Sequence, residues 1–424
     1  MSGRLVIIGG GLTGVLAALE GHRLGWRDIV LHERFEALGG VALPKVNAGL
    51  EMRSGCIYFG GPEDPIVKTL QDIGARFETF DNRFASVAPG PDGTRLVCTD
   101  FGGPALDCED FTDEAPAGPS LAHRLGAYPP QIAMHLARYC QWALDGADPS
   151  TLDADCVTPL AINRVFPAGA DIEALAGAKR SNRWTDELYA IPRQLWGRTD
   201  NLTASLPVDG FAGLFETCRK ALAERGVEVR LNSLIPPRQA LDETGRDDVI
   251  VWAANPTVLF KPVGLTPPRL LRKVFTSLVF EADFDGPCPA YVQNFTAEGD
   301  VFRAYVYRSG GQTLVTAECV READALAVAD QLPAMLASFG ALSVGPVRHV
   351  AVEPRWIFHT LEAMSGLKSL RSTLAGRLGD RFVAGAWEPY PKAAKLAEVN
   401  ASLARARRAV DRPDEGDGQL SLAV

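Results

Sequence analysis

The chain has 424 residues, of which 46% are hydrophobic, and a formal net charge of −9 at pH 7. This is enough apolar material for a large core and two domains, and the acidic balance excludes a typical nucleic-acid-binding protein, which needs a basic surface. No apolar run approaches the roughly 20 residues that span a bilayer, and a strand pattern begins at once, so we expect no membrane span, no signal peptide and a cytoplasmic location.

The first predicted elements surround a glycine-rich turn at residues 9–14. A short buried strand runs into Gly-Gly-Gly-Leu-Thr-Gly, and an alanine-rich helix and a second strand follow. This is the context of the dinucleotide-binding fingerprint. Gly9 permits the sharp turn, Gly11 lets the backbone approach a pyrophosphate at the positive end of the helix, and Gly14 lets helix and strand pack closely. The expected contacts to the pyrophosphate are Gly9, Gly11, Leu12, Thr13 and Gly14.

The second strand ends at an acidic residue, Glu33, which lies 19 positions after Gly14. A carboxylate there can accept hydrogen bonds from ribose hydroxyls. Arg34 follows, and Gly39 and Gly40 come soon after. A Gly-Gly pair in this place resembles the pattern of flavoproteins that bind FAD, not NAD. The resemblance implies a loop that runs close to the pyrophosphate and ribityl chain, with Glu33, Arg34, Gly39 and Gly40 among the cofactor-binding residues.

The sequence LEMRSGCIYFGG follows the glycine pair. Related flavoproteins often place an arginine or histidine loop near the flavin at this point, so Arg53 becomes a candidate catalytic residue and Tyr58 a candidate substrate-binding residue. Arg53 could neutralise a developing flavin anion or grip a carboxylate. The alternative is a surface salt bridge, which an arginine serves equally well.

Residues 86–120 are rich in proline, glycine and acids, which indicates a loop-rich entry into an inserted region, and apolar spacing predicts a helix over 131–144. Further on, Arg193 and Arg198 flank Trp196. Two arginines around a tryptophan suit a phosphate or nucleotide, and Arg198 is a candidate substrate-binding residue. The alternative is a solvated helix end.

A helix over 214–225 and strands over 227–231 and 248–253 follow a proline-glycine loop. Taken alone, they indicate a βαβ-like unit. With that loop they resemble the central part of the flavin amine oxidase superfamily, where the chain returns to the FAD domain. The resemblance implies that the backbone near Glu228 and Val229 touches the adenine.

Four short β-rich runs with turns between them predict an antiparallel sheet, and a helix is expected over 322–338. The runs cover residues 274–280, 290–294, 301–307 and 313–319. In the family that the chain resembles, a sheet of this kind forms the floor of the substrate cavity above the flavin. Arg303, Tyr305 and Tyr307 alternate along one strand and so share a face. They are a candidate substrate-binding wall, with Tyr305 and Tyr307 as candidate catalytic residues; the alternative is an exposed face with aromatic residues of ordinary β-propensity.

The last predicted elements are a strand in RFVAGAW, residues 381–387, and a helix over 392–410. The segment resembles the turn that closes the FAD domain in this family, which implies cofactor contacts from Gly385, Ala386 and Trp387. The family's usual aspartate is Ala386 here, so either Glu388 or the backbone takes its place. Trp387 and Tyr390 resemble the aromatic cage that holds an amine beside the flavin; the alternative is packing against the proline-rich turn.

The remaining reactive side chains form no recognisable site. Neither zinc spacing nor a disulfide framework is present, so we expect no metal site and reduced, mostly buried cysteines; each of the six histidines is expected to be structural. The cysteines are Cys56, Cys98, Cys108, Cys140, Cys156, Cys218, Cys288 and Cys319.

The predicted fold is α/β, with a Rossmann-like FAD-binding domain of the GR2 type and an inserted α+β substrate domain with a mixed or antiparallel sheet. The FAD domain is expected at 1–85, 205–260 and 350–411, the substrate domain at 86–204 and 261–349, and a flexible tail at 412–424.

Together these patterns resemble the flavin amine oxidase and protoporphyrinogen oxidase-like FAD superfamily, and more weakly UDP-galactopyranose mutase. The resemblance implies an FAD-dependent oxidoreductase that removes a hydride from a C–N or C–C bond of a small molecule. A mutase acting on a nucleotide sugar without net redox change is the first alternative. The sequence GRLG at 376–379 favours it, and the absence of histidine from residues 47–60 opposes it. A non-catalytic flavoprotein-fold partner is the second. The sequence leaves the oligomeric state open.

Overall fold

The structure of the chain is a computed structural model. It describes residues 3–53, 58–81, 84–89, 95–99, 105–106, 117–164, 166–167, 172–181, 185, 188–189, 203–242, 245, 247–358, 360–387 and 392–411.

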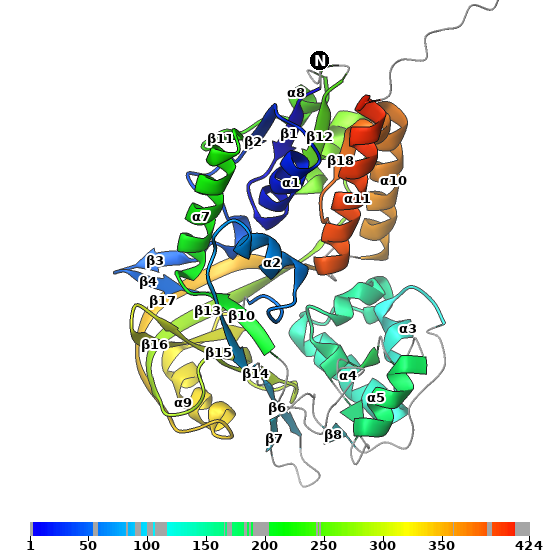
Figure 1. Cartoon of the computed structure of the whole chain (residues 1–424). Helices are drawn as coiled ribbons and strands as arrows, with labels where there is room; N and C mark the ends of the chain where they lie inside the picture. Colours follow the sequence, from blue (N-terminus) through cyan, green and yellow to red (C-terminus); the bar gives the residue numbers. More distant parts are fainter. Residues whose placement is uncertain are drawn as a thin grey trace, which may run out of the picture.

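The upper part of the molecule in Figure 1 is built on a parallel sheet, whose described strands lie in the order β11-β2-β1-β12-β18. β2 and β12 are buried at every residue. Such runs of branched apolar residues are typical of parallel strands covered on both faces. The strands are β1 (Leu5–Ile8), β2 (Ile29–His32), β11 (Glu228–Arg230), β12 (Val249–Trp252) and β18 (Phe382–Ala384).

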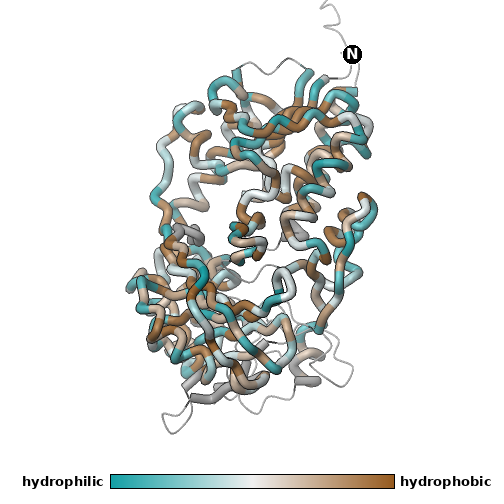
Figure 2. The backbone as a smooth tube through the Cα atoms, turned by 90° about the vertical axis from the view of Figure 1, so that its left-hand side faces the viewer, coloured by the Kyte–Doolittle hydropathy of each residue, from teal (hydrophilic) through white to brown (hydrophobic). Residues whose placement is uncertain are grey.

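Helices cover both faces of this sheet. Leu5 and Ile7 of β1 point into a core with α1, α7 and α11, whereas Val6 and Ile8 point into a second core with α8 and α10. Hydropathy alternates along the flanking helices in Figure 2, as expected for elements with one buried face. The helices are α1 (Leu12–Arg23), α7 (Gly210–Glu224), α8 (Pro237–Asp242), α10 (Leu361–Leu378) and α11 (Lys392–Asp411).

A second, larger sheet lies at the lower left of Figure 1, with its described strands in the order β17-β13-β16-β15-β14-β6-β7. All neighbours are antiparallel except β14 and β6. Helix α9 (Ala325–Leu336) packs on one face of it. The strands are β6 (Phe84–Pro89), β7 (Arg95–Thr99), β13 (Leu271–Phe284), β14 (Ala290–Asn294), β15 (Val301–Ser309), β16 (Gln312–Cys319) and β17 (Leu342–Phe358).

A helical cluster lies at the lower right of Figure 1, with its own apolar core around Tyr139 and Phe302. It contains α3 (Leu121–Leu125), α4 (Pro130–Ala143) and α5 (Ile172–Ser181), and a short pair formed by β8 (Ala105–Leu106) and β9 (Phe166–Pro167). The connections to the upper part include the hairpin β3 (Lys45–Asn47) and β4 (Leu50–Met52), helix α2 (Pro65–Gln71), and the pair β5 (Phe77–Asp81) and β10 (Thr203–Pro207).

The predicted domain boundaries at residues 85 and 350 fall inside strands of the large sheet, β6 and β17. The large sheet therefore takes in residues that the prediction gave to the FAD domain, and the upper part resumes with α10 at Leu361. Among the described helices, none is long and apolar enough to cross a membrane.

Candidate functional site

The glycine-rich turn joins β1 to α1, and its glycines leave the backbone at the start of that helix uncovered by side chains of the turn. Gly9 has φ = +106°, a conformation that L side chains rarely adopt. A Cβ on Gly14 would lie 1.9 Å from the Gly9 carbonyl oxygen, so only glycine lets helix and strand pack this closely. A Cβ on Gly11 would meet no atom within 4 Å. Gly11 therefore faces open space at a helix N-terminus that no side chain caps.

The second glycine pair lies directly beside this turn. The Gly39 amide donates to the Gly10 carbonyl oxygen (2.9 Å), and Gly39 forms an isolated parallel bridge with Gly11. Gly39 and Gly40 have φ of +127° and +55°, and a Cβ on Gly40 would lie 3.3 Å from the Gly11 Cα. A Cβ on Gly39 would lie 2.8 Å from the Phe215 ring of α7. The two segments form a glycine cradle (Gly9–Gly14, Gly39 and Gly40) of the kind that binds phosphate through backbone amides.

Glu33 lies against the glycine cradle. It is 5% exposed, and its carboxylate accepts bonds from the amides of Gly10 (2.7 Å) and Phe35 (2.9 Å). A carboxylate offers about four acceptor positions, so two remain for ribose hydroxyls. The Arg34 guanidinium stacks over the Phe35 ring, 4.4 Å from its centroid. Glu33 thus lies where the sequence predicts a ribose-binding acid.

Val229 lies on β11, the outermost described strand at this end of the parallel sheet. The Glu33 amide donates to the Arg230 carbonyl oxygen (2.9 Å), so Arg230 turns its backbone groups toward β2. Successive residues of a strand turn those groups to opposite sides, so Val229 turns its amide and carbonyl outward. The outward-facing amide and carbonyl of Val229, beside Glu33, suit the edge of an adenine. The glycine cradle, Glu33 and Val229 together fit the dinucleotide that the sequence predicts.

The C-terminal turn reaches the same sheet from the other side. The Gly385 amide donates to the Trp252 carbonyl oxygen (2.9 Å), and a Cβ on Gly385 would lie 2.6 Å from that oxygen. The Trp387 indole also donates to it (2.8 Å), and the Arg371 guanidinium lies 5.5 Å from the indole centroid. Trp387 is 7% exposed and belongs to the core under α10. These contacts describe a packing residue, not the expected cage. Ala386 is half-buried in this turn, and Glu388 and Tyr390 lie outside the described residues.

A row of buried polar side chains crosses the face of the large sheet opposite α9. Strand register aligns one residue from each of five adjacent strands, and all five are at most 8% exposed. The row consists of Ser86, Gln293, Arg303, Glu318 and Ser277. The α9 face of the same strands is apolar. Burial of polar groups is costly unless they are bonded, and here Arg303 pairs with Glu318 and Gln293 bonds to Tyr139. We call this face the polar face.

Arg53, the residue directly after β4, joins the polar face. Its guanidinium pairs with Glu51 (Nη2–Oε2 2.9 Å) and approaches the Tyr305 hydroxyl (3.4 Å). The Tyr307 hydroxyl accepts from the Arg53 amide and donates to the Glu51 carbonyl oxygen, both at 3.0 Å. Tyr305 and Tyr307 stack, with centroids 5.1 Å apart. Arg53, Tyr305 and Tyr307, predicted from separate segments, therefore meet, and Arg53 forms a buried ion pair, not the surface salt bridge of the alternative.

The Glu51–Arg53 pair also reaches the upper part of the molecule. The Ala212 amide of α7 donates to Glu51 (3.3 Å), and the Arg53 guanidinium lies 5.4 Å from the Phe211 ring centroid. The same helix carries Phe215, which packs on the glycine cradle. Contacts along α7 thus connect the cradle to the polar face.

Burial sets the protonation states around Arg53. Burial raises the pKa of the Tyr307 phenol above its ordinary value, although its bonds to Arg53 and Thr316 oppose the rise. Burial disfavours the charge of Arg53, but Tyr305 and Glu51 outweigh it and raise the guanidinium pKa. Burial also raises the pKa of the nearby Cys288 thiol to about 11. At neutral pH Arg53 is therefore a cation, and Tyr307 and Cys288 are neutral.

The other predicted residues lie elsewhere. Tyr58 packs edge-on against Phe80, with ring centroids 6.1 Å apart. Arg198, with Arg193 and Trp196, lies outside the described residues. The GRLG sequence forms the end of α10, where Gly379 has φ = +60° and Arg377 pairs with Asp242; helix termination explains it without a ligand. The cysteines whose side chains are described are free, and no metal-binding cluster occurs in the described part of the chain.

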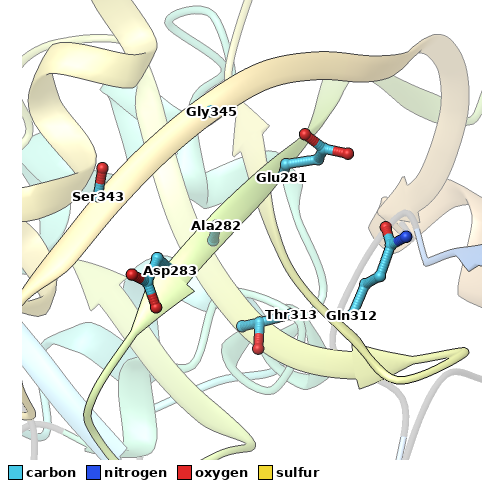
Figure 3. Close-up of a pocket in the computed structure, with 7 residues that line it drawn as sticks. All are labelled: Glu281, Ala282, Asp283, Gln312, Thr313, Ser343 and Gly345. Atoms are coloured by element: carbon cyan, nitrogen blue, oxygen red, sulfur yellow. The ribbon is translucent and has the colours of Figure 1, made fainter.

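A pocket of about 380 Å³ lies where β13 ends and where β16 and β17 begin (Figure 3). Strands β13, β16 and β17 line it, with the carboxylates of Glu281 and Asp283 among its polar groups. Glu281 is already paired with Arg348 on the surface. The pocket contains no residue of the predicted site.

Several polar-face residues were not predicted: Glu51, Tyr291, Gln293 and Glu318. The Gln293 amide accepts from the Tyr291 hydroxyl (2.7 Å) and donates to the Tyr139 hydroxyl of α4 (2.8 Å). A signal was present, because polar residues alternate with apolar ones along AYVQ and VTAEC. Which alternating face is buried depends on strand order, which the sequence does not show.

Comparison with models of known protein families gives no match, and comparison with curated proteins gives none either. Solved structures do match. Reduced UDP-galactopyranose mutase aligns with a TM-score of 0.61 and 13% identity, over 97% of this chain and 93% of that chain. Cyclohexylamine oxidase from Brevibacterium oxydans IH-35A aligns with a TM-score of 0.54 and 11% identity, over 97% and 99%.

A candidate protoporphyrinogen oxidase from Exiguobacterium sp. 255-15 also aligns, with a TM-score of 0.53 and 15% identity, over 97% of this chain and 99% of that chain. The chain therefore shares the fold of these proteins across almost its whole length. The predicted fold class and the predicted resemblance are confirmed at the level of the fold, including the mixed second sheet.

Proposed function

We propose that the protein binds FAD and is an FAD-dependent oxidoreductase that acts on a small molecule at the polar face. The observation that carries the proposal is the glycine cradle, in which Gly11 faces open space at an uncapped helix N-terminus beside Glu33. Gly9, Gly11, Leu12, Thr13, Gly14, Gly39 and Gly40 would hold the pyrophosphate. Glu33 with Arg34 would hold the ribose, and the Val229 backbone the adenine.

Bound FAD would supply hydride acceptance, which protein side chains cannot provide. The chain's own contribution would be to position the substrate and exclude water. Arg53, Tyr305 and Tyr307 are the candidates for contact with the reacting part of the substrate, and Arg303 for more distant contact. Trp387 is assigned a packing role because its indole bonds to the Trp252 carbonyl oxygen. Gly385 and Ala386 remain candidates for backbone contact with the cofactor.

The test is an anaerobic titration of the purified protein followed by its visible spectrum. We expect one class among amines and unsaturated ring compounds to bleach the flavin band. If no compound bleaches it, and a nucleotide sugar isomerises only after chemical reduction of the flavin, the oxidoreductase proposal fails. The protein would then be a mutase, which the TM-score of 0.61 to a mutase keeps as the second candidate.

A further inference from the structure

Both arginines of the polar face are already matched by buried carboxylates. Arg303 forms an ion pair with Glu318, which is 1% exposed, and strand register places the two side chains opposite each other on β15 and β16. Arg53 pairs with Glu51 through Nε (3.1 Å) and Nη2 (2.9 Å). Among the described residues, the arginine and carboxylate charges of this face therefore cancel.

Splitting such a pair is unfavourable. A substrate phosphate or carboxylate that recruited Arg303 would leave the Glu318 carboxylate buried without its cation, and an uncompensated buried charge is strongly destabilising. A cationic substrate that paired with Glu318 or Glu51 would likewise leave Arg303 or Arg53 buried without its carboxylate. The arginines therefore stabilise the polar face and do not attract a charged substrate group to it.

The remaining groups of the polar face are neutral. Tyr305 and Tyr307 present parallel rings, tilted by 15° to each other, and burial keeps the Tyr307 phenol protonated. On the neighbouring strand the Tyr291 hydroxyl donates to the Gln293 amide, which in turn donates to Tyr139, so these polar groups are neutral and bonded within the protein. Aromatic faces, hydroxyls and amides recognise uncharged groups through stacking and neutral hydrogen bonds.

We propose, in an inference that rests on the proposed function, that the substrate is uncharged where it contacts the polar face. It would present a neutral amine, an alcohol or an unsaturated ring there, and no phosphate or carboxylate. Glu51 and Glu318 are then the residues that determine specificity. They exclude anions by neutralising the arginines that would otherwise bind them.

The test compares anion binding by the FAD-saturated full-length protein and its charge-removed variants. UDP and benzoate are titrated at constant ionic strength and followed by perturbation of the flavin spectrum. We expect no saturable binding to the wild-type protein, and saturable binding after Glu318→Gln or Glu51→Gln with a Kd at least about tenfold below the highest anion concentration tested. Glu51→Gln is the second variant because the Glu51 side chain is 12% exposed, against 1% for Glu318. Glu216→Gln, which removes the exposed partner of Arg219 on α7, is the matched control and should change nothing.

Two results would overturn the inference. The first is saturable binding of UDP or benzoate to the wild-type protein that Arg303→Gln or Arg53→Gln abolishes. The second is that Glu318→Gln and Glu51→Gln both fold and neither binds UDP or benzoate more tightly than the wild type. Flavin content is read from the same spectrum before any anion is added. A protein without flavin contradicts the proposed function, whereas arginine-dependent anion binding by a flavin-loaded protein contradicts only this inference.

Discussion

At the scale of the residue, two glycines of one turn have opposite roles. Gly14 is required by the fold, because its missing Cβ would lie 1.9 Å from the Gly9 oxygen. Gly11 is not, because its Cβ would point into open space. Both roles could be predicted from the spacing of the fingerprint, since strand, turn and helix follow one another along the chain and need no distant partner.

This contrast predicts the outcome of Gly11→Ala. The variant should fold as the wild type does, and should bind FAD at least about tenfold more weakly, because a methyl group blocks the backbone bonds, worth about 1.5–3 kcal/mol each, to a charged pyrophosphate. Flavin content and thermal unfolding measure the two effects. Gly376→Ala is the control, since its Cβ also meets no atom within 4 Å but lies in α10. Full flavin retention in Gly11→Ala would contradict the cradle.

The buried ion pair gives a second prediction at this scale. Arg53→Met leaves Glu51 buried without its cation and should lower the free energy of unfolding by about 3–5 kcal/mol. The double variant Glu51→Leu/Arg53→Met should recover much of that loss, because both charges are removed. Urea denaturation measures both free energies. Equal losses in the single and double variants would mean that the Glu51 carboxylate, left without Arg53, does not destabilise the protein.

At the scale of the element, the structure shows why one long strand was not predicted. β17 contains Gly345, Pro346 and Pro354, residues that argue against a strand. It nevertheless forms because it is the outermost described strand at its end of the sheet, where a missing amide costs no ladder bond. The predicted runs at 274–280, 290–294, 301–307 and 313–319 all form strands, and Arg303, Tyr305 and Tyr307 share a face as expected. Their partners Glu51 and Glu318 could not be predicted, because pairing depends on strand order and register.

Helix α9 offers a prediction at the same scale. The Asp324 carboxylate caps its first turn, accepting from the amides of Leu326 and Ala327 (3.0 Å each). Asp324→Ala should lower the free energy of unfolding by about 0.5–2 kcal/mol. FAD content should be unchanged, because α9 packs on the face of the sheet opposite the polar face. Urea denaturation and the flavin spectrum test the two statements, and loss of flavin would place α9 closer to the site than its contacts indicate.

At the scale of the whole molecule, helix α7 connects the glycine cradle to the buried polar face. The fold could be predicted from motifs at both ends and in the middle of the chain. The proposed substrate class could not, because it rests on charge pairing between β15 and β16 and between Glu51 of β4 and Arg53 just after it, which appears only when the strands are assembled.

Stability should depend on pH through buried histidines. Burial lowers the pKa of His32 and of His135 below 6.5, and the Arg230 guanidinium adds to the effect at His32. Between the lowered value and 6.5 the unfolded chain binds more protons than the native protein, so the free energy of unfolding falls as the pH falls through that window. Urea denaturation near pH 7.5 and pH 5 should show the loss, and His32→Gln/His135→Gln should reduce it. If the free energy of unfolding of the double variant falls as much between pH 7.5 and pH 5 as that of the wild type, groups other than these histidines cause the fall.

The most direct measurement of the central claim is the absorption spectrum of the purified protein, with identification of the cofactor released on denaturation. We expect a flavin spectrum and FAD bound at one molecule per chain, directly or after reconstitution. Protein that carries no flavin and takes up none when FAD is added would contradict the assignment of the glycine cradle, and with it the proposed function.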